Sequence, residues 1–477
     1  MKICRLAFVF ALIFAMSCAA FAHHDPASPD NELAKKLDDI IHADTVKRGF
    51  IGLQIESLKD GRVLYSHNAT NILIPASCMK LIVTSATLDA LGPDFMLKTE
   101  VLASSEPKDG VLSGDLILKG YGDSSLDTKG LEQMADAVKA AGITRVTGDV
   151  VADDSYFDGQ RFGWGWSWDY EPAEYAAPIG ALCLNHNCIT VVVKPGKEGE
   201  AAKVGFEPAA TCFKVEGEPK TTAAGSKSNV WAWRQRQSNV VSCGGDIAAD
   251  AKPDTTTLSV NDPTVWIGDV FMNMLKARGI AVEGKVKLDK APDGAKLITR
   301  HESEPLSSIL ENINRHSINV MAESLLRTLG AQVKGRGTGS AGISAEIDYL
   351  KKIGVEPDEV NIQDGSGLSR ADMVSPRALV TILKYMYKSP YSKVWLDSLP
   401  VAGGDGTLYF SMRGTAAEGN LRAKTGNLGW VQSMSGYVNT KGGEPLVFSL
   451  IVNNYKCSDN DIYRMRTKIG VTLAELP

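Results

Sequence analysis

The sequence has no surplus of positive charge and, beyond its first residues, no apolar run long enough to cross a bilayer. Its 51 Lys and Arg residues face 56 Asp and Glu residues, which gives a formal net charge of −5 and a pI near 5.9. This balance does not predict a basic surface for nucleic acid or an anionic membrane. No internal repeat is visible, so a solenoid is not expected. With 477 residues, 44% of them hydrophobic, the chain is predicted to be a soluble globular protein of two or three domains.

Residues 1–22 have the pattern of a secretory signal peptide. A positively charged start precedes the apolar run Leu6–Met16, which is short for a membrane span, and Ala20-Phe21-Ala22 fits a cleavage site. We expect cleavage after Ala22 and export to the periplasm. Lipid attachment at Cys18 is the alternative, but Ala15 stands where such a site usually has leucine.

Six of the eight cysteines lie beyond the signal peptide. Export permits disulfides. Cys183 and Cys188 bracket a short loop and could pair, and Cys212 and Cys243 are the next candidates. Because six cysteines allow fifteen pairings, the sequence leaves the pairing open. Cys183, His186 and Cys188 could instead be metal ligands, but no second ligand pair lies nearby, so we predict no metal site.

Local patterns predict helices at both ends of the chain with strands beside them. Residues 31–47 have amphipathic spacing. A hairpin is predicted from Phe50–Ile55 and Val63–Tyr65 around an Asp-Gly turn. The helical run that starts near Ser77 ends at Gly92-Pro93.

The middle of the chain has a different pattern of apolar and turn residues. From about residue 95 to 290, short β-like runs alternate with Gly, Asp and Pro turns, and only one helix is clear, at Leu131–Ala141. After residue 290 helices return, then strands and a last helix. We therefore predict an α+β domain built from residues 23–94 and 291–477, split by a large, mostly-β insertion at 95–290.

The start of the first long helix holds a candidate catalytic pair. Ser77 and Lys80 are three residues apart, so on a helix they share one face. A serine hydroxyl needs an adjacent base to become a nucleophile, and a lysine with a lowered pKa can be that base. Alone this motif is weak, and the ordinary alternative is a helix-start serine. Ser105 and Lys108 also fit the spacing, but the proline between them breaks helical geometry.

Two further motifs follow in the last third of the chain. Ser317-Ile318-Asn319 lies at a helix junction, and Lys424-Thr425-Gly426 ends a strand-like run. Ser317 with Lys424 can form a proton path to a leaving amine, and Asn319 can hold Lys80 and a substrate amide. Ser-x-Asn also occurs at residues 259–261 and 458–460, but not at a helix junction between the other two motifs.

The same region supplies candidate substrate contacts. The backbone N–H groups of Ser77 and Asn427 can form an oxyanion hole. Lys424 and Thr425 can bind a carboxylate at the end of a substrate, and Gly426 lets a substrate backbone lie close to the strand. The three motifs in this order are those of penicillin-binding proteins and serine β-lactamases.

At this level of detail the chain resembles the low-molecular-mass class C penicillin-binding proteins, which are the peptidase S13 D-alanyl-D-alanine carboxypeptidases. The resemblance covers nearly the whole mature chain, and the segment Asp364–Arg370 (Asp-Gly-Ser-Gly-Leu-Ser-Arg) carries it most specifically. The other matching segments are Pro75–Leu81, Gly120–Leu126, Asp153–Phe157, Trp166–Asp169, Arg315–Glu323, Gly403–Leu408 and Ala423–Gly426. Two departures stand out: Ser124 replaces the usual proline, and Asn427 follows Lys-Thr-Gly where a smaller residue or threonine is typical.

The resemblance implies a penicillin-binding domain with a five-stranded antiparallel sheet and helices on both faces. It implies that the insertion is a second domain with a third nested in it, at about residues 185–255. It also implies DD-carboxypeptidase and DD-endopeptidase action on peptidoglycan stem peptides, acylation of Ser77 by β-lactam antibiotics, and no metal or organic cofactor. The sequence leaves the oligomeric state open, a dimer being one option.

Related enzymes hold the free end of the diamino acid side chain with an acidic residue of the insertion and an arginine. By position these are Asp153 and Arg370 here. The ordinary alternatives are a turn or capping aspartate for Asp153, and for Arg370 a loop arginine that pairs with Asp364 or Asp372.

Two other functions fit parts of the pattern. A serine β-lactamase would need a fast deacylation base between the second and third motifs, and no convincing glutamate is present there. A catalytically silent peptidoglycan-binding scaffold would have lost at least one motif residue, but all of them are intact. We therefore expect a serine DD-carboxypeptidase and DD-endopeptidase.

Overall fold

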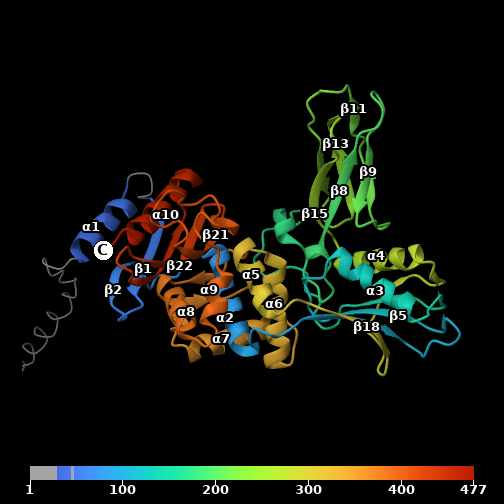
Figure 1. The fold of residues 1–477 in the computed structure, drawn as a ribbon, viewed down its shortest axis with the longest axis horizontal. Helices are drawn as coiled ribbons and strands as arrows, with labels where there is room; N and C mark the ends of the chain where they lie inside the picture. The colour runs from blue at the N-terminus through green and yellow to red at the C-terminus, as the bar shows by residue number, and fades with distance from the viewer. Residues whose placement is uncertain (1–29, 44–47) are drawn as a thin grey trace, which may run out of the picture.

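The protein has two lobes, and the first and last segments that the structure describes share one of them. The computed structural model describes residues 30–43 and 48–477. The expected signal peptide, the cut after Ala22 and the alternative lipid site at Cys18 lie outside the described residues. Figure 1 shows the first and last segments together in one lobe and the middle of the chain in the other. Within the described residues, no helix is both long and apolar enough to cross a membrane.

The first lobe is built on a five-stranded antiparallel sheet in the order β2-β1-β23-β22-β21. The predicted hairpin forms its first two strands. The order leaves β21 at one edge, with no strand beyond it. The strands are β1 (Phe50–Ser57), β2 (Val63–His67), β21 (Arg422–Leu428), β22 (Val431–Asn439) and β23 (Pro445–Asn453).

Helices cover both faces of this sheet, as Figure 1 shows. Along β23, Val447 and Ile451 pack into the cluster of one face, whereas Phe448 and Leu450 pack into that of the other. Because both faces are covered, eight of the nine residues of β23 are buried. One face carries α2 (Lys80–Leu91), α5 (Leu306–His316), α6 (Asn319–Lys334), α7 (Gly339–Lys352), α8 (Pro376–Lys388) and α9 (Ser392–Ser398), and the other carries α1 (Asp30–Ile41) and α10 (Asp459–Ala474). The predicted fold class is confirmed.

The second lobe holds a mixed five-stranded sheet in the order β17-β7-β5-β3-β18. One face packs against α3 (Thr128–Ala140) and α4 (Pro263–Ala277). We did not predict α4 from the sequence, although its polar residues Asp269, Asn273 and Lys276 recur at helical spacing between buried apolar residues. The strands are β3 (Lys98–Ala103), β5 (Leu116–Gly120), β7 (Val150–Asp153), β17 (Val286–Leu288) and β18 (Lys296–Glu302), beside a small parallel sheet of β4 (Val111–Leu112), β6 (Arg145–Val146) and β16 (Ala281–Val282).

A β module stands on this lobe, upright in Figure 1. Its strands form small sheets between residues 188 and 259. They are β8 (Cys188–Lys194), β9 (Lys203–Glu207), β10 (Lys214–Glu216), β11 (Lys220–Thr222), β12 (Trp231–Arg234), β13 (Val240–Gly244), β14 (Asp246–Ala248) and β15 (Asp254–Ser259). Their shortness explains the weak periodicity of this part of the sequence.

The insertion ends later than the sequence suggested. Strand β18 pairs antiparallel with β3 through Lys296–Ala103 and Glu302–Lys98, so the second lobe closes at residue 302 and not at 290. An edge strand with several exposed residues gives no clear alternating pattern, which is why the boundary was placed too early.

All six cysteines of the described chain are free thiols. The candidate pairs Cys183–Cys188 and Cys212–Cys243 are not formed. Cys188 Sγ instead donates to the backbone oxygen of His186 at 3.5 Å, and burial raises the pKa of the Cys188 thiol to about 12. Buried thiols of this kind behave as small apolar side chains.

Candidate active site

Ser77 lies in a tight turn that precedes α2. The turn is a 3₁₀ helix, η1 (Ala76–Met79), and Ala76 has φ of 48°, which is strained for a residue with a Cβ. Two glycines let other segments press on this turn. A Cβ on Gly367 would lie 1.9 Å from the Ala76 oxygen, and a Cβ on Gly426 would lie 2.5 Å from the Pro75 oxygen. The turn is therefore held in place by close backbone contacts.

Side chains from the central sheet fix the same turn. Ser433 Oγ donates to the Pro75 oxygen at 2.6 Å, and Cys78 Sγ donates to the Lys424 oxygen at 3.3 Å. Because these contacts come from β22 and β21, the position of Ser77 is set by the sheet as well as by its own helix.

Lys80 is fully buried behind Ser77. Its Nζ lies 3.0 Å from Ser77 Oγ, 2.5 Å from Asn319 Oδ1 and 2.6 Å from the Ser366 oxygen. Neither of the last two oxygens can donate a proton. A neutral amine has two N–H groups for these two acceptors and one lone pair, which is left for the hydroxyl proton of Ser77.

Electrostatics also favour the neutral amine at Lys80. Burial and the charge of Lys424 lower the pKa of Lys80 well below its usual range, and Asp364 and Glu323 act in the opposite direction. A lysine in this state can accept a proton from an adjacent serine.

A second lysine faces a second serine across the site. Lys424 Nζ, on the edge strand β21, lies 2.9 Å from Ser317 Oγ and 2.9 Å from the Thr425 oxygen. Burial lowers the pKa of Lys424 to about 8. Ser317 ends α5 in the left-handed conformation, with φ of 61°, and this turn aims its hydroxyl into the site.

Asn319 joins the two lobes. Its Oδ1 accepts from Lys80, and its Nδ2 donates to the backbone oxygen of Tyr175 in the insertion at 2.7 Å. We expected Asn319 to hold both Lys80 and a substrate amide. The structure has the first contact, and the group expected to bind substrate is occupied by the protein's own backbone.

The Lys-Thr-Gly segment lies along the free edge of the sheet. Thr425 Oγ1 donates to Thr407 Oγ1 at 2.8 Å, in the short turn η6 (Gly406–Leu408). An edge strand offers backbone groups to which an extended peptide can add. Gly426 and Asn427 occupy the part of β21 that passes Ser77.

A cleft of about 420 Å³ opens over these groups. The insertion contributes Tyr170 and Tyr175, whose rings meet edge to face at 5.6 Å. The sequence did not single out these tyrosines, because nothing in their segment distinguishes them from other surface aromatics. The lining residues are Ser77, Tyr170, Tyr175, Ser317, Asn319, Gly367, Leu368, Asn427, Leu428, Gly429 and Asp459.

Buried carboxylates shape the loop that presents the Ser366 oxygen to Lys80. Asp364 accepts from the backbone N–H groups of Ser366, Gly367 and Ser369 at 3.0, 2.6 and 2.7 Å. Glu323 on α6 accepts from Ser366 N–H at 2.9 Å. The sequence analysis gave Glu323 no role and named Asp364 only as an alternative partner of Arg370, although both lie in the motifs that carried the resemblance.

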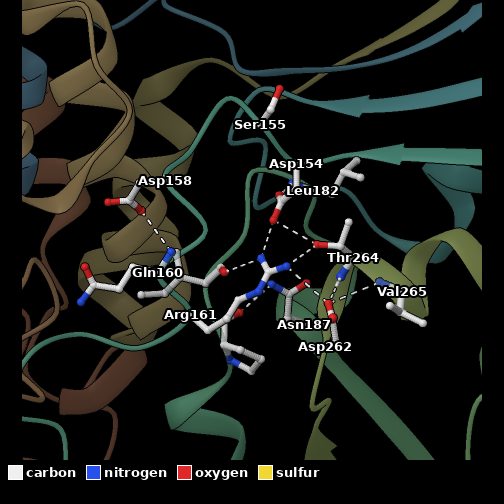
Figure 2. Close-up of polar contacts among 12 residues, drawn as sticks. Asp154, Ser155, Asp158, Gln160, Arg161, Leu182, Asn187, Asp262, Thr264 and Val265 are labelled. Carbon is white, nitrogen blue, oxygen red and sulfur yellow. Dashed lines mark hydrogen bonds and ion pairs between the residues drawn. The ribbon is translucent and has the colours of Figure 1, made fainter. Parts of the chain in front are cut away.

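The insertion reaches this loop as well. Trp166 Nε1 donates to Asp364 Oδ2 at 2.8 Å. Figure 2 shows how the base of the segment that carries Trp166 is held: Asp154 and Asp262 pair with Arg161, which also donates to Thr264 Oγ1 at 2.6 Å. This network connects the segment to the start of α4.

Arg370 lies at the rim of the cleft. Its Nη2 donates to the Gly429 oxygen at 2.6 Å. It does not pair with Asp364 or Asp372, the alternative that the sequence allowed. Gly429 lines the cleft, so Arg370 supports its wall.

The structure places Asp153 away from the expected substrate contact. Its side chain is fully buried on β7, 3.2 Å from Lys119 Nζ, and its oxygens accept from the N–H groups of Ser155 and Ala291. Asp153 does not line the cleft. A motif position next to a strand end was not enough to tell a substrate contact from a buried turn aspartate.

No metal site is evident in the described part of the chain. No group of three or more His, Cys, Asp or Glu side chains is placed there to hold an ion. The considered trio of Cys183, His186 and Cys188 does not form one.

Comparisons with known proteins identify the family of the chain. The sequence profile of the D-Ala-D-Ala carboxypeptidase 3 (S13) family matches residues 33–476. The chain is 35% identical over 458 residues to a D-alanyl-D-alanine carboxypeptidase of Actinomadura sp., covering 93% of this chain and 85% of that protein. It is 27% identical over 420 residues to D-alanyl-D-alanine carboxypeptidase DacB of Haemophilus influenzae, covering 86% of each.

A solved structure extends the agreement to the fold. Penicillin binding protein 4 (dacB) from Haemophilus influenzae superposes with a TM-score of 0.79 at 25% identity, covering 94% of this chain and 100% of that one. Its complex with a β-lactam matches with a TM-score of 0.74 at 24% identity, covering 91% and 98%. The chain belongs to the D-Ala-D-Ala carboxypeptidase 3 (S13) family and is a serine-type D-Ala-D-Ala carboxypeptidase.

Proposed function

We propose that Ser77 is the nucleophile of this enzyme and Lys80 its base. The observation that carries the proposal is the set of three contacts of Lys80 Nζ. In the neutral amine, which the lowered pKa of Lys80 favours, two N–H groups serve Asn319 and Ser366 and the lone pair faces Ser77 Oγ. Ser77 Oγ bonds to the carbonyl carbon of the penultimate D-Ala while Lys80 takes its proton. The backbone N–H groups of Ser77 and Asn427 hold the oxyanion.

The leaving group departs on the side of the second lysine. The bond between the carbonyl carbon and the terminal amide nitrogen breaks, and that nitrogen receives the proton that Lys80 took from Ser77, relayed through Ser317 and Lys424. Lys80 is then neutral again. Lys424 and Thr425 bind the carboxylate at the substrate's end. Water then attacks the ester on Ser77, releases the shortened peptide and returns a proton to the serine.

We propose peptidoglycan stem peptides as the substrates. A terminal D-Ala gives carboxypeptidase action, and a D-Ala joined to a second stem gives endopeptidase action. The backbone of the stem adds along β21, and its amide displaces the Tyr175 oxygen from Asn319. β-Lactams acylate Ser77 in the same way and leave slowly.

We place the mature enzyme in the periplasm, after cleavage behind Ala22. The support is the residue pattern of the first 22 residues. Mass spectrometry of the exported protein tests this: a first residue of His23 agrees with it, and retention of Cys18 contradicts it.

The catalytic proposal is tested by D-Ala release from a synthetic stem peptide that ends in D-Ala-D-Ala. Ser77→Ala is expected to abolish release. Ser105→Ala is the matched control, because Ser105 has the same spacing to a lysine but is part-exposed and donates only to the Ser113 oxygen. If Ser77→Ala retains activity, the proposal fails. Rapid turnover of penicillin by the wild type would favour a β-lactamase instead.

A further inference from the structure

The outer face of one small sheet in the β module carries two exposed tryptophans. Trp231 and Trp233 stand two residues apart on β12, with 52% and 49% of their surfaces exposed. Side chains two apart on a strand point to the same side, with Cα atoms about 7 Å apart. Large exposed aromatics grouped on one surface mark binding sites more often than chance.

The neighbouring strand is built to leave these rings open. Trp231 and Trp233 pair with Gly244 and Ser242 of β13. A Cβ on Gly244 would lie 2.7 Å from the Trp231 ring, so the missing side chain lets the indole lie flat on the strand. Small partners of this kind do not cover the solvent side of the rings.

Hydrogen-bonding groups continue the same face. Gln235 follows in the outward series, and its Nε2 donates to Glu216 Oε2 at 2.7 Å and to Ser242 Oγ at 3.0 Å. We call Trp231, Trp233, Gln235, Glu216 and Ser242 the tryptophan face. It places flat apolar rings beside an amide, a carboxylate and a hydroxyl.

The tryptophan face is connected to the catalytic cleft by short contacts. Arg234, at the end of β12, is buried and donates to the Glu171 oxygen at 3.1 Å. Arg236 stacks on the exposed ring of Trp168, 4.0 Å from its centroid. Glu171 lies four residues before Tyr175, which lines the cleft.

We propose that the tryptophan face binds the glycan strand of peptidoglycan while the cleft takes the stem peptide. An N-acetylhexosamine ring has an apolar C–H face that stacks on an indole and a rim of hydroxyl and N-acetyl groups that hydrogen-bond to amides and carboxylates. The inference rests on the proposed function, because the stem peptide is attached to that glycan. Holding the glycan raises the effective concentration of stem peptides at Ser77.

Glycan binding can be measured without catalysis. The full chain with Ser77→Ala is titrated with peptide-free glycan strands, and the heat of binding is measured by calorimetry. Adding Trp231→Ala and Trp233→Ala is expected to weaken binding about tenfold or more. Phe50→Ala is the control, because Phe50 is 62% exposed on β1 of the other lobe, and it is expected to have no effect. Gln235→Ala, which removes no ring, is expected to weaken binding by a smaller factor and serves if the double variant does not fold.

Several results would overturn the inference. These are no binding of glycan by the wild type, unchanged binding in the double variant, or self-association in sedimentation that the two tryptophan changes abolish. The last result would make the face an interface between copies. Activity gives a second test: the double variant with Ser77 intact should cleave soluble peptide at the wild-type rate but intact sacculi more slowly. Because the titration involves no chemistry, glycan binding by an enzyme that does not release D-Ala would overturn the proposed function alone.

Discussion

Replacing Gly367 by alanine isolates the contact that positions the nucleophile. Gly367 has φ of +78°, and its Cβ would lie 1.9 Å from the Ala76 oxygen, with Ala76 adjacent to Ser77. Real Cβ atoms essentially never approach below 3.0 Å, so the turn and the loop must separate by about 1 Å or more. A displacement of that size at a reacting group costs about a hundredfold in rate.

The control separates this displacement from backbone strain. Gly335 has φ of +71° and nothing within 4 Å of a Cβ, so Gly335→Ala carries a similar left-handed penalty of about 1–2 kcal/mol without the clash. We expect both variants to melt at lower temperature than the wild type. Only Gly367→Ala should acylate about a hundredfold more slowly in a stopped-flow assay with a fluorescent penicillin. Wild-type acylation by Gly367→Ala would refute the view that this contact positions Ser77.

Three further changes test other parts of the account. Lys424→Met should abolish most D-Ala release yet raise the free energy of unfolding at pH 7 by about 1–3 kcal/mol, because a buried ammonium is removed. Folding lowers the pKa of Lys424 from 10.5 to about 8, so between pH 8 and 10.5 the unfolded chain binds more protons than the folded one. The free energy of unfolding of the wild type should therefore rise with pH over this range. It should rise less in Lys424→Met, which lacks the titrating group. Asp364→Asn removes a negative charge that raises the pKa of Lys80, so the amine should stay neutral at lower pH. The acid limb of the pH profile of the acylation rate should therefore shift to lower pH. A shift to higher pH would contradict the effect assigned to Asp364. Asp153→Ala should lower the unfolding free energy by about 3–5 kcal/mol, because Lys119 loses its buried partner, and should leave selectivity among diamino acid side chains unchanged; altered selectivity would restore Asp153 as a substrate contact.

Much of the first lobe could be predicted from sequence. The hairpin at β1 and β2 has an Asp-Gly turn between alternating strands, and helices α5 and α8 have strong amphipathic spacing. Such patterns depend only on residues close together in the chain, so they can be recognised without knowing the fold. Helix α4 could have been predicted too, because Asp269, Asn273 and Lys276 recur at helical spacing among apolar residues. Strand β18 shows such a pattern only weakly, because its edge position leaves several residues exposed.

Some residues of the candidate site could be predicted from the sequence and others could not. Ser77, Lys80, Ser317, Asn319 and Lys424 could be identified because each lies in a short motif, and the structure brings their side chains together. Tyr170, Tyr175 and the carboxylate of Glu323 could not. Their roles depend on how the insertion and the 364–370 loop fold against the first lobe, which no local pattern records. The Asn319 contact to the Tyr175 oxygen is of this kind, because it joins residues 144 positions apart.

The central claim is that Ser77 becomes acylated with Lys80 as its base. The most direct measurement is peptide mass spectrometry of the protein after brief exposure to penicillin. We predict one penicilloyl adduct, on the peptide that contains Ser77, and its absence in both Ser77→Ala and Lys80→Met. An adduct on another residue, or an undiminished adduct in Lys80→Met, would contradict the account.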